Sequence, residues 1–394
     1  MGAKMQSLQA FTTDEFRRRV AGTKRLMAEA GMDALLVLSE PNIFYLTGYE
    51  GFSDYVPQLA LITANDDVPW LILREMDVAC ATPTCWLPEG YTVPYAEKFI
   101  GSRDRTPWEP IADFIASKTK SRRLGVEFSA KGFGVKEHAT LLRHLKIEAF
   151  LDADGLVSKM KRIKSEQELK YIGEAAKVVD RAMLRGVEKI GVGVRQADVG
   201  ATVMEALCAG TPEIPGSPGR PPTMAPQAPF ANAPHLKWSD GPYVEGMQTN
   251  FEMGGFRHRY CCGLSRTVYL GKPPEKLTRT HAAVMDGFEA ALAMIRPGNT
   301  TGSVADAFHK AFDPHGIRKE SRIGYSIGID WADGGATLQK GDTMVIEPNM
   351  TLHLIVGIWE PNDGYVFSET IQIDQTTGRS LTTVPRTLFV RPGS

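Results

Sequence analysis

The chain has 394 residues, 43% hydrophobic and 23% charged, and its 45 basic and 46 acidic side chains leave a formal net charge of -1. This balance gives no electrostatic reason to expect a nucleic acid or an anionic membrane as partner. No stretch approaches the roughly 18 to 20 apolar residues of a transmembrane helix, and the start lacks the apolar core of a signal peptide, so we expect a cytoplasmic protein of about two domains.

The first 156 residues alternate between helical and strand patterns. The segment Thr12–Glu15 has the form of a capping box and predicts the start of a helix. Apolar runs at 34–38, 58–63 and 70–73 predict strands, the last two joined as a hairpin. Helical and extended stretches then alternate up to residue 151. This order predicts a mixed sheet covered by helices, closed as an N-terminal α/β domain over residues 1–156.

The remainder of the chain contains an internal repeat. The segment GVRQADVGATVMEAL from Gly193 aligns with GNTTGSVADAFHKAF from Gly298, 105 residues later. Each copy follows a stretch with the pattern of a long helix, at 165–190 and at 277–295. The repeat predicts a C-terminal domain over 157–394 with pseudo-two-fold duplicated halves and a site where the halves meet.

Two kinds of segment separate the helices of this domain. Residues 210–241 contain eight prolines, which favours an ordered loop or an active-site cover. Residues 247–270 and 342–374 are strand-like. In the first of these strand-like segments, Gly254-Gly255 indicates a bend or a close approach of another backbone.

Several short motifs along the chain resemble those of one enzyme family. They are KRIKS at 161–165, SRT at 265–267, GYSIG at 324–328, IEP at 346–348 and SET at 368–370. Their order and the duplicated half resemble the creatinase/aminopeptidase family with its "pita-bread" fold, over essentially the whole chain. The resemblance implies an α/β (α+β) protein in which a creatinase-like mixed α/β domain precedes a pita-bread catalytic domain.

Peptidases of that family hold two metal ions with two Asp, one His and two Glu, a hard, oxygen-rich ligand shell. At the matching positions this chain has Glu252 and Gly263 for the two Asp and Tyr325 for the His. Glu347 and Glu369 stand at the two Glu positions. The resemblance therefore implies a cluster of three carboxylates, and we expect neither a metal site nor another cofactor.

Within the family, the chain resembles the metal-free ectoine hydrolases. This resemblance rests on NFEM at 250–253, APHL at 233–236, TLH at 351–353 followed by GIW at 357–359, and LTGYEG at 46–51. Those enzymes open a cyclic amidine that carries a carboxylate. By this resemblance Glu252 is the catalytic nucleophile, His235 shuttles protons, and Glu347 and Glu369 complete the catalytic set.

The same resemblance implies a substrate pocket. Carboxylates attract an amidinium ion, and Trp359 either packs on the flat ring of the substrate or serves as a core or lid aromatic. We expect Tyr325 and His353 in the pocket, and one of Arg257, Arg259 and Arg266 on the substrate carboxylate. A homodimer is expected, in which Tyr49 from the N-terminal domain covers the partner's pocket or is simply a core aromatic.

The sequence thus predicts a metal-independent hydrolase of a non-peptide C–N bond, acting on a small molecule. The leading substrate is ectoine, opened to N-acetyl-L-2,4-diaminobutyrate. Creatinase-like hydrolysis of another guanidino or amidine compound is the first alternative. A metal-dependent Xaa-Pro aminopeptidase or prolidase is the second, and a binding module that has lost activity is the third.

Overall fold

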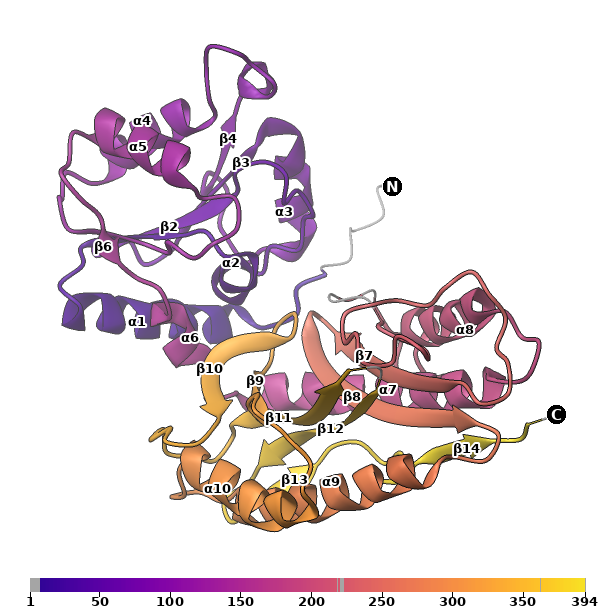
Figure 1. The fold of residues 1–394 in the computed structure, drawn as a ribbon. Helices are drawn as coiled ribbons and strands as arrows, with labels where there is room; N and C mark the ends of the chain where they lie inside the picture. Colours follow the sequence, from indigo (N-terminus) through magenta and orange to yellow (C-terminus); the bar gives the residue numbers. More distant parts are fainter. Residues whose placement is uncertain (1–7, 218, 220–222, 362, 394) are drawn as a thin grey trace. The chain divides into compact units, whose positions relative to one another are not determined.

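The computed structural model describes residues 8–217, 219, 223–361 and 363–393, and the chain folds into two compact units, Met1–Met160 and Lys161–Ser394. Each unit has its own β-sheet (Figure 1). The domain boundary predicted after residue 156 falls inside helix α6 (Leu156–Lys161). Within the described ranges, no helix combines the length and the apolar character that crossing a membrane requires.

The first unit is a six-stranded sheet in the order β4-β3-β2-β1-β5-β6. Its elements are α1 (Thr13–Glu29), β1 (Ala34–Val37), α2 (Glu40–Thr47), β2 (Leu59–Thr63), β3 (Trp70–Arg74), α3 (Val78–Thr84), β4 (Thr92–Tyr95), α4 (Trp108–Lys118), β5 (Leu124–Val126), α5 (Val135–Leu145) and β6 (Leu151–Asp152). Strand β1 pairs antiparallel with β2 and parallel with β5, so the sheet is mixed, as predicted. Side chains of α4 and α5 such as Ile111 and Leu141 join Leu36 and Leu61 in one buried cluster.

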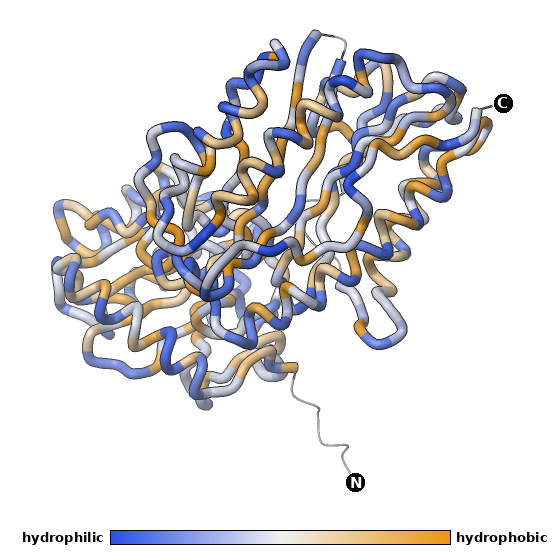
Figure 2. Tube along the Cα trace, turned by 90° about the horizontal axis from the view of Figure 1, so that it is seen from below, coloured by the Kyte–Doolittle hydropathy of each residue, from blue (hydrophilic) through white to orange (hydrophobic). Residues whose placement is uncertain are grey.

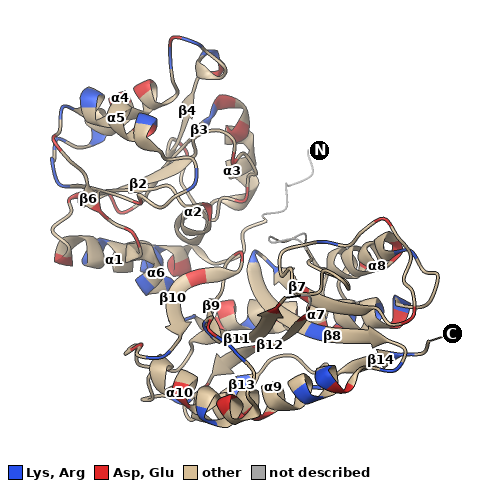
Figure 3. Cartoon of the chain, viewed as in Figure 1, with Lys and Arg blue, Asp and Glu red and all other residues tan. Residues whose placement is uncertain are grey.

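The second unit is an eight-stranded sheet with the path β10-β9-β11-β12-β8-β14, in which β7 pairs with β8 and β13 with β12. Its elements are α7 (Glu166–Lys189), α8 (Gln196–Ala209), β7 (Gln248–Arg257), β8 (Tyr260–Leu270), α9 (Glu275–Met294), α10 (Thr301–Phe312), β9 (Gly324–Ile327), β10 (Ala332–Leu338), β11 (Thr351–Glu360), β12 (Asp363–Ile373), β13 (Gly378–Ser380) and β14 (Phe389–Arg391). Lys and Arg are interspersed with Asp and Glu on the helices of both units (Figure 3).

The internal repeat corresponds to two equivalent helix pairs, α7 with α8 and α9 with α10. Gly193 and Gly298, the first residues of the two copies, have φ values of 79° and 91°, a left-handed conformation that suits glycine in the turn before each second helix. The apolar positions that the alignment matches are all buried: Val199, Val203 and Leu207 on α8, and Val304, Phe308 and Phe312 on α10. The predicted duplication is therefore present in the fold.

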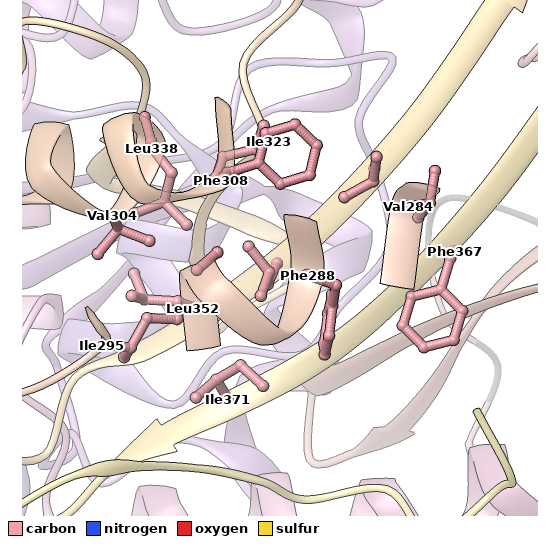
Figure 4. Close-up of a cluster of buried hydrophobic side chains, with 14 of the residues drawn as sticks. Val284, Phe288, Ile295, Val304, Phe308, Ile323, Leu338, Leu352, Phe367 and Ile371 are labelled. Atoms are coloured by element: carbon pink, nitrogen blue, oxygen red, sulfur yellow. The ribbon is translucent and has the colours of Figure 1, made fainter. Parts of the chain in front are cut away.

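One face of the second sheet is covered by these helices. Alternate residues of β11 and β12, among them Leu352, Phe367 and Ile371, pack with Phe288 of α9 and Phe308 of α10 (Figure 4). Figure 2 shows apolar and polar positions interspersed along the trace of the chain. Because successive strand residues point to opposite sides, the residues between them belong to the other side, which we term the inner face.

Candidate active site

Glu252 lies on the inner face, on the hairpin formed by β7 and β8. Its neighbours Phe251 and Met253 are fully buried on the helix side, whereas Glu252 is only partly buried and lies opposite Ser265 of β8. Among the described residues, no side chain pairs with its carboxylate. Burial raises the pKa of Glu252 to about 7, because the charged form loses hydration without gaining a partner. The carboxyl group is therefore poised to change its charge near neutral pH.

A chain of hydrogen bonds crosses the inner face beside Glu252. The indole Nε1 of Trp331 donates to the Tyr325 hydroxyl at 2.7 Å, and this hydroxyl lies 3.3 Å from Nδ1 of His353. Nε2 of His353 lies 2.7 Å from the Ser368 hydroxyl, which donates to Ser265 at 2.8 Å.

The direction of each bond in this chain follows from its two ends. An indole N–H can only donate, and the Ser368 proton is used toward Ser265. With this direction, Ser368 accepts from Nε2–H of His353, and Nδ1 accepts from Tyr325. This set of bonds corresponds to a neutral imidazole with its proton on Nε2.

His353 is completely buried, and burial lowers its pKa to about 3. Its ring meets those of Tyr325 and Trp331 edge to face, with centroids 5.4 Å and 5.2 Å apart. A histidine that stays neutral at physiological pH cannot serve as a proton shuttle there. The structure places it behind Tyr325, where it orients the tyrosine hydroxyl.

Gly263 leaves room for these rings. A Cβ at this position would lie 3.0 Å from the His353 ring and 3.1 Å from the Trp331 ring. A metal-ligating side chain at residue 263 would thus need space that two aromatic side chains already occupy.

Glu369 does not join Glu252. It is buried on the helix side of β12, where it accepts from Arg266 at 2.9 Å and from Arg386 at 2.8 Å. The residue of β12 that belongs to the inner face is Ser368, since it lies opposite Ser265 in the sheet. Arg266 is fully buried with Glu369, so neither side chain reaches the inner face.

Glu347 is likewise separate from Glu252. It lies in the connection before β11, its side chain is 49% exposed, and its nearest cation is Arg162 at 3.6 Å. On β11 the inner-face position opposite Ser368 is Ile355, which is apolar. Among the described residues, the expected cluster of three carboxylates is therefore absent, and Glu252 shares the inner face with Ser265, Ser368, Ile355 and His353.

This set of side chains does not fit a pair of metal ions. Within the described part of the chain, no group of three or more His, Cys, Asp and Glu residues has the geometry to hold a metal. Dinuclear hydrolytic sites depend on several carboxylates and imidazoles that converge on the ions. Around Glu252 the hydroxyls of Ser265 and Ser368 are engaged with each other, and His353 is held by its own hydrogen bonds.

Trp359 and His235 lie at the margins of the inner face. Trp359 belongs to the same side of β11 as His353 and is 36% exposed, with its ring over Gly357. His235 is exposed on the proline-rich loop, which is joined to β7 by backbone hydrogen bonds between Met224 and Glu252. No described contact links His235 to Glu252.

Tyr49 belongs to the first unit. It is only 2% exposed, its hydroxyl has no hydrogen-bond partner among the described residues, and burial raises its pKa. Phe52 and Tyr55, which follow it, are 66% and 69% exposed. Within its own unit Tyr49 is a core aromatic.

The sequence motifs did not identify Ser265, Ser368 or Trp331 as site residues. The alternation of strand residues could have indicated the two serines, because every second residue of β8 and β12 shares a face with Glu252. The strand pattern could not indicate Trp331, because this residue lies outside the regular strands and has a φ of 138°.

The chain matches the model of metallopeptidase family M24 over residues 170–375 and that of the creatinase/prolidase N-terminal domain over residues 19–163. It is 35% identical over 388 residues to y4tL, an uncharacterized hydrolase/peptidase of Sinorhizobium fredii. It is 34% identical over 393 residues to the ectoine hydrolase of Halomonas elongata. Each comparison covers 97% of this chain and 98% of the relative.

Among solved structures, a prolidase from Thermococcus sibiricus superposes with a TM-score of 0.85 at 18% identity, covering 97% of this chain and 100% of the prolidase. At this identity the likeness concerns the fold. It confirms the predicted arrangement of a creatinase-like N-terminal domain followed by a pita-bread domain.

Proposed function

The chain belongs to metallopeptidase family M24, and from this premise we propose that it is a metal-independent hydrolase that opens the cyclic amidine ring of ectoine. The product would be N-acetyl-L-2,4-diaminobutyrate. Support comes from the 34% identity with an ectoine hydrolase along nearly the whole chain. The substrate contains a cationic amidinium ring, which suits Glu252, an unpaired carboxylate among the described residues of the inner face.

The observation that carries the proposal is the environment of Glu252. Ser265 lies opposite Glu252, and Gly263, Ser368 and Ile355 share its face of the sheet without providing metal ligands; the His353 ring fills the space next to Gly263. An uncompensated carboxylate attracts an amidinium ion strongly in a partly dehydrated site. Binding of that cation would in turn lower the pKa of Glu252 and favour its ionised, nucleophilic form.

The reaction then proceeds in two steps at the amidinium carbon. An oxygen of Glu252 attacks this carbon, a C–O bond forms, and one ring C–N bond breaks with its electron pair going to nitrogen, which takes up a proton. Water hydrolyses the resulting ester-like intermediate, frees Glu252 and leaves an N-acetyl group on the product.

The two alternatives differ in what they require of the site. A creatinase-like amidinohydrolase would use the same carboxylate on an acyclic guanidino compound. A Xaa-Pro peptidase would need metal ligands, and the described residues around Glu252 do not provide them. The prolidase likeness at 18% identity concerns the fold and does not favour peptidase activity.

Product analysis on three substrates tests the proposal. We expect NMR to detect ring opening of ectoine, no hydrolysis of creatine and no cleavage of a Xaa-Pro dipeptide. Glu252→Gln should abolish ring opening, because an amide is a poor nucleophile. The matched control is Glu205→Gln on α8, whose carboxylate is 54% exposed and far from the sheet's inner face, and it should keep full activity. Hydrolysis of creatine or the dipeptide alone would refute the proposal.

A further inference from the structure

The proposed substrate carries a carboxylate as well as a cation, so its site needs a cationic side chain. The arginines at 257, 259 and 266 do not supply one. Arg257 donates to Glu174 at 3.1 Å and Arg259 to Asp330 at 2.9 Å, while Arg266 is buried in its pair with Glu369. All three guanidinium groups are already neutralised by carboxylates of this chain.

Arg322 is in a different position. It immediately precedes β9, it is exposed, and its guanidinium lies over the ring of Tyr325 at 4.5 Å from the centroid. Among the described residues no carboxylate pairs with it. A guanidinium stacked on an aromatic face keeps the N–H groups at its edge available, and these can form a bidentate pair with a carboxylate.

A cavity of about 190 Å³ lies beside this stack. Arg322, Tyr325 and Thr337 line it together with the backbone of β10. Its one acidic lining residue, Asp342, accepts a hydrogen bond from the backbone of Met344 at 3.0 Å. The cavity has the size of a small molecule, and Arg322 is the one cationic side chain among the described residues that line it.

Tyr325 connects this cavity to Glu252. Burial above all, together with the negative charge of Glu252, raises the pKa of Tyr325 to about 12, while the hydrogen bond from Trp331 and the positive charge of Arg322 oppose the rise. Both charges therefore act on the same hydroxyl. A ligand bound over Tyr325 therefore lies within electrostatic reach of Arg322, which attracts an anion, and of Glu252, which attracts a cation.

We propose that Arg322 binds the carboxylate of the substrate and thereby places the cationic ring at Glu252. This inference rests on the proposed function and adds the residue that selects a substrate with both charges. It also explains why the stacked arginine has no carboxylate partner among the described residues, since that partner arrives with the ligand.

The test compares Arg322→Gln and Arg322→Lys with Arg318→Gln. Arg318 is four residues upstream, is 78% exposed and pairs with Glu320, so its replacement is the matched control. For ectoine, Arg322→Gln should raise KM about 10- to 100-fold with kcat nearly unchanged, the usual effect of losing a charge-assisted hydrogen bond to the substrate. Arg322→Lys should restore part of the affinity, and Arg318→Gln should behave as wild type.

A second substrate separates recognition of the carboxylate from a general effect. For the same ring without its carboxylate, 2-methyl-1,4,5,6-tetrahydropyrimidine, the wild type and Arg322→Gln should have equal KM values. If the wild type opens ectoine and Arg322→Gln leaves its KM unchanged, the inference fails and the proposed function stands. If the wild type does not open ectoine, calorimetry decides: tighter ectoine binding by wild type than by Arg322→Gln supports the inference, and equal or no binding overturns it.

Discussion

Glu252 combines two properties that a carboxylate nucleophile needs. It is partly buried, so that its charge is poorly hydrated, and the described strand residues that share its side of the sheet include no other carboxylate. The motif around residue 252 made this glutamate predictable from the sequence. Its isolation was not predictable, because that depends on which residues of three other strands share its face.

The ionisation of Glu252 should appear in the pH dependence of activity. Burial raises the pKa of Glu252 to about 7 in the free enzyme, and only the ionised form attacks. We therefore expect kcat/KM to rise with pH through about 7, and kcat to rise at a lower pH because the bound cation favours the carboxylate. A kcat/KM that falls through pH 7 would show that the protonated form is the active one and would contradict a nucleophilic role.

At the scale of the strands, alternation decides which residues take part in the site. The sequence placed Glu369 in the catalytic set because SET matched a family motif letter by letter. In β12, however, Ser368 and Thr370 share the inner face, and Glu369 points to the helices. A register shift of one residue exchanges the two faces of a strand, so a motif alone could not distinguish Ser368 from Glu369.

This placement gives Glu369 a structural role. Removing one partner of a buried ion pair leaves the other charge uncompensated, so Glu369→Gln should lower the free energy of unfolding by about 3 to 5 kcal/mol. The folded variant should retain kcat. Urea unfolding and initial rates measure the two quantities.

The control for Glu369 is another glutamate that pairs with the same arginine, Arg386. Glu289 pairs with Arg386 at 2.6 Å but is 57% exposed, and Glu289→Gln should cost at most about 1 kcal/mol. A Glu369→Gln protein of normal stability with a large loss of kcat would assign Glu369 to the chemistry after all.

At the scale of the whole chain, the internal repeat was the most informative feature of the sequence. Matching apolar positions 105 residues apart fixed the helices of both halves, and all of these positions are buried in the structure. The turn of the β7–β8 hairpin was less predictable. His258 and Arg259, which have positive φ values, form this turn. The Gly254-Gly255 pair has the other of its two expected roles, because Gly255 allows the backbone of α7 to approach closely.

The chain has the fold of a metallopeptidase family, but its described residues offer no suitable set of metal ligands on the inner face. This combination leads to one expectation about the whole molecule. Its activity should not depend on metal ions, because Glu252 acts directly on a substrate that brings its own positive charge. Neither chelation nor added metal should then change turnover.

The decisive measurement is the rate of ectoine ring opening by protein treated with EDTA, verified as metal-free by elemental analysis, with and without added Mn²⁺. We expect the same kcat/KM as for untreated protein in both samples. Loss of ring opening on chelation with recovery on addition of Mn²⁺, or Mn²⁺-dependent cleavage of a Xaa-Pro dipeptide with ectoine left intact, would contradict metal-independent catalysis by Glu252.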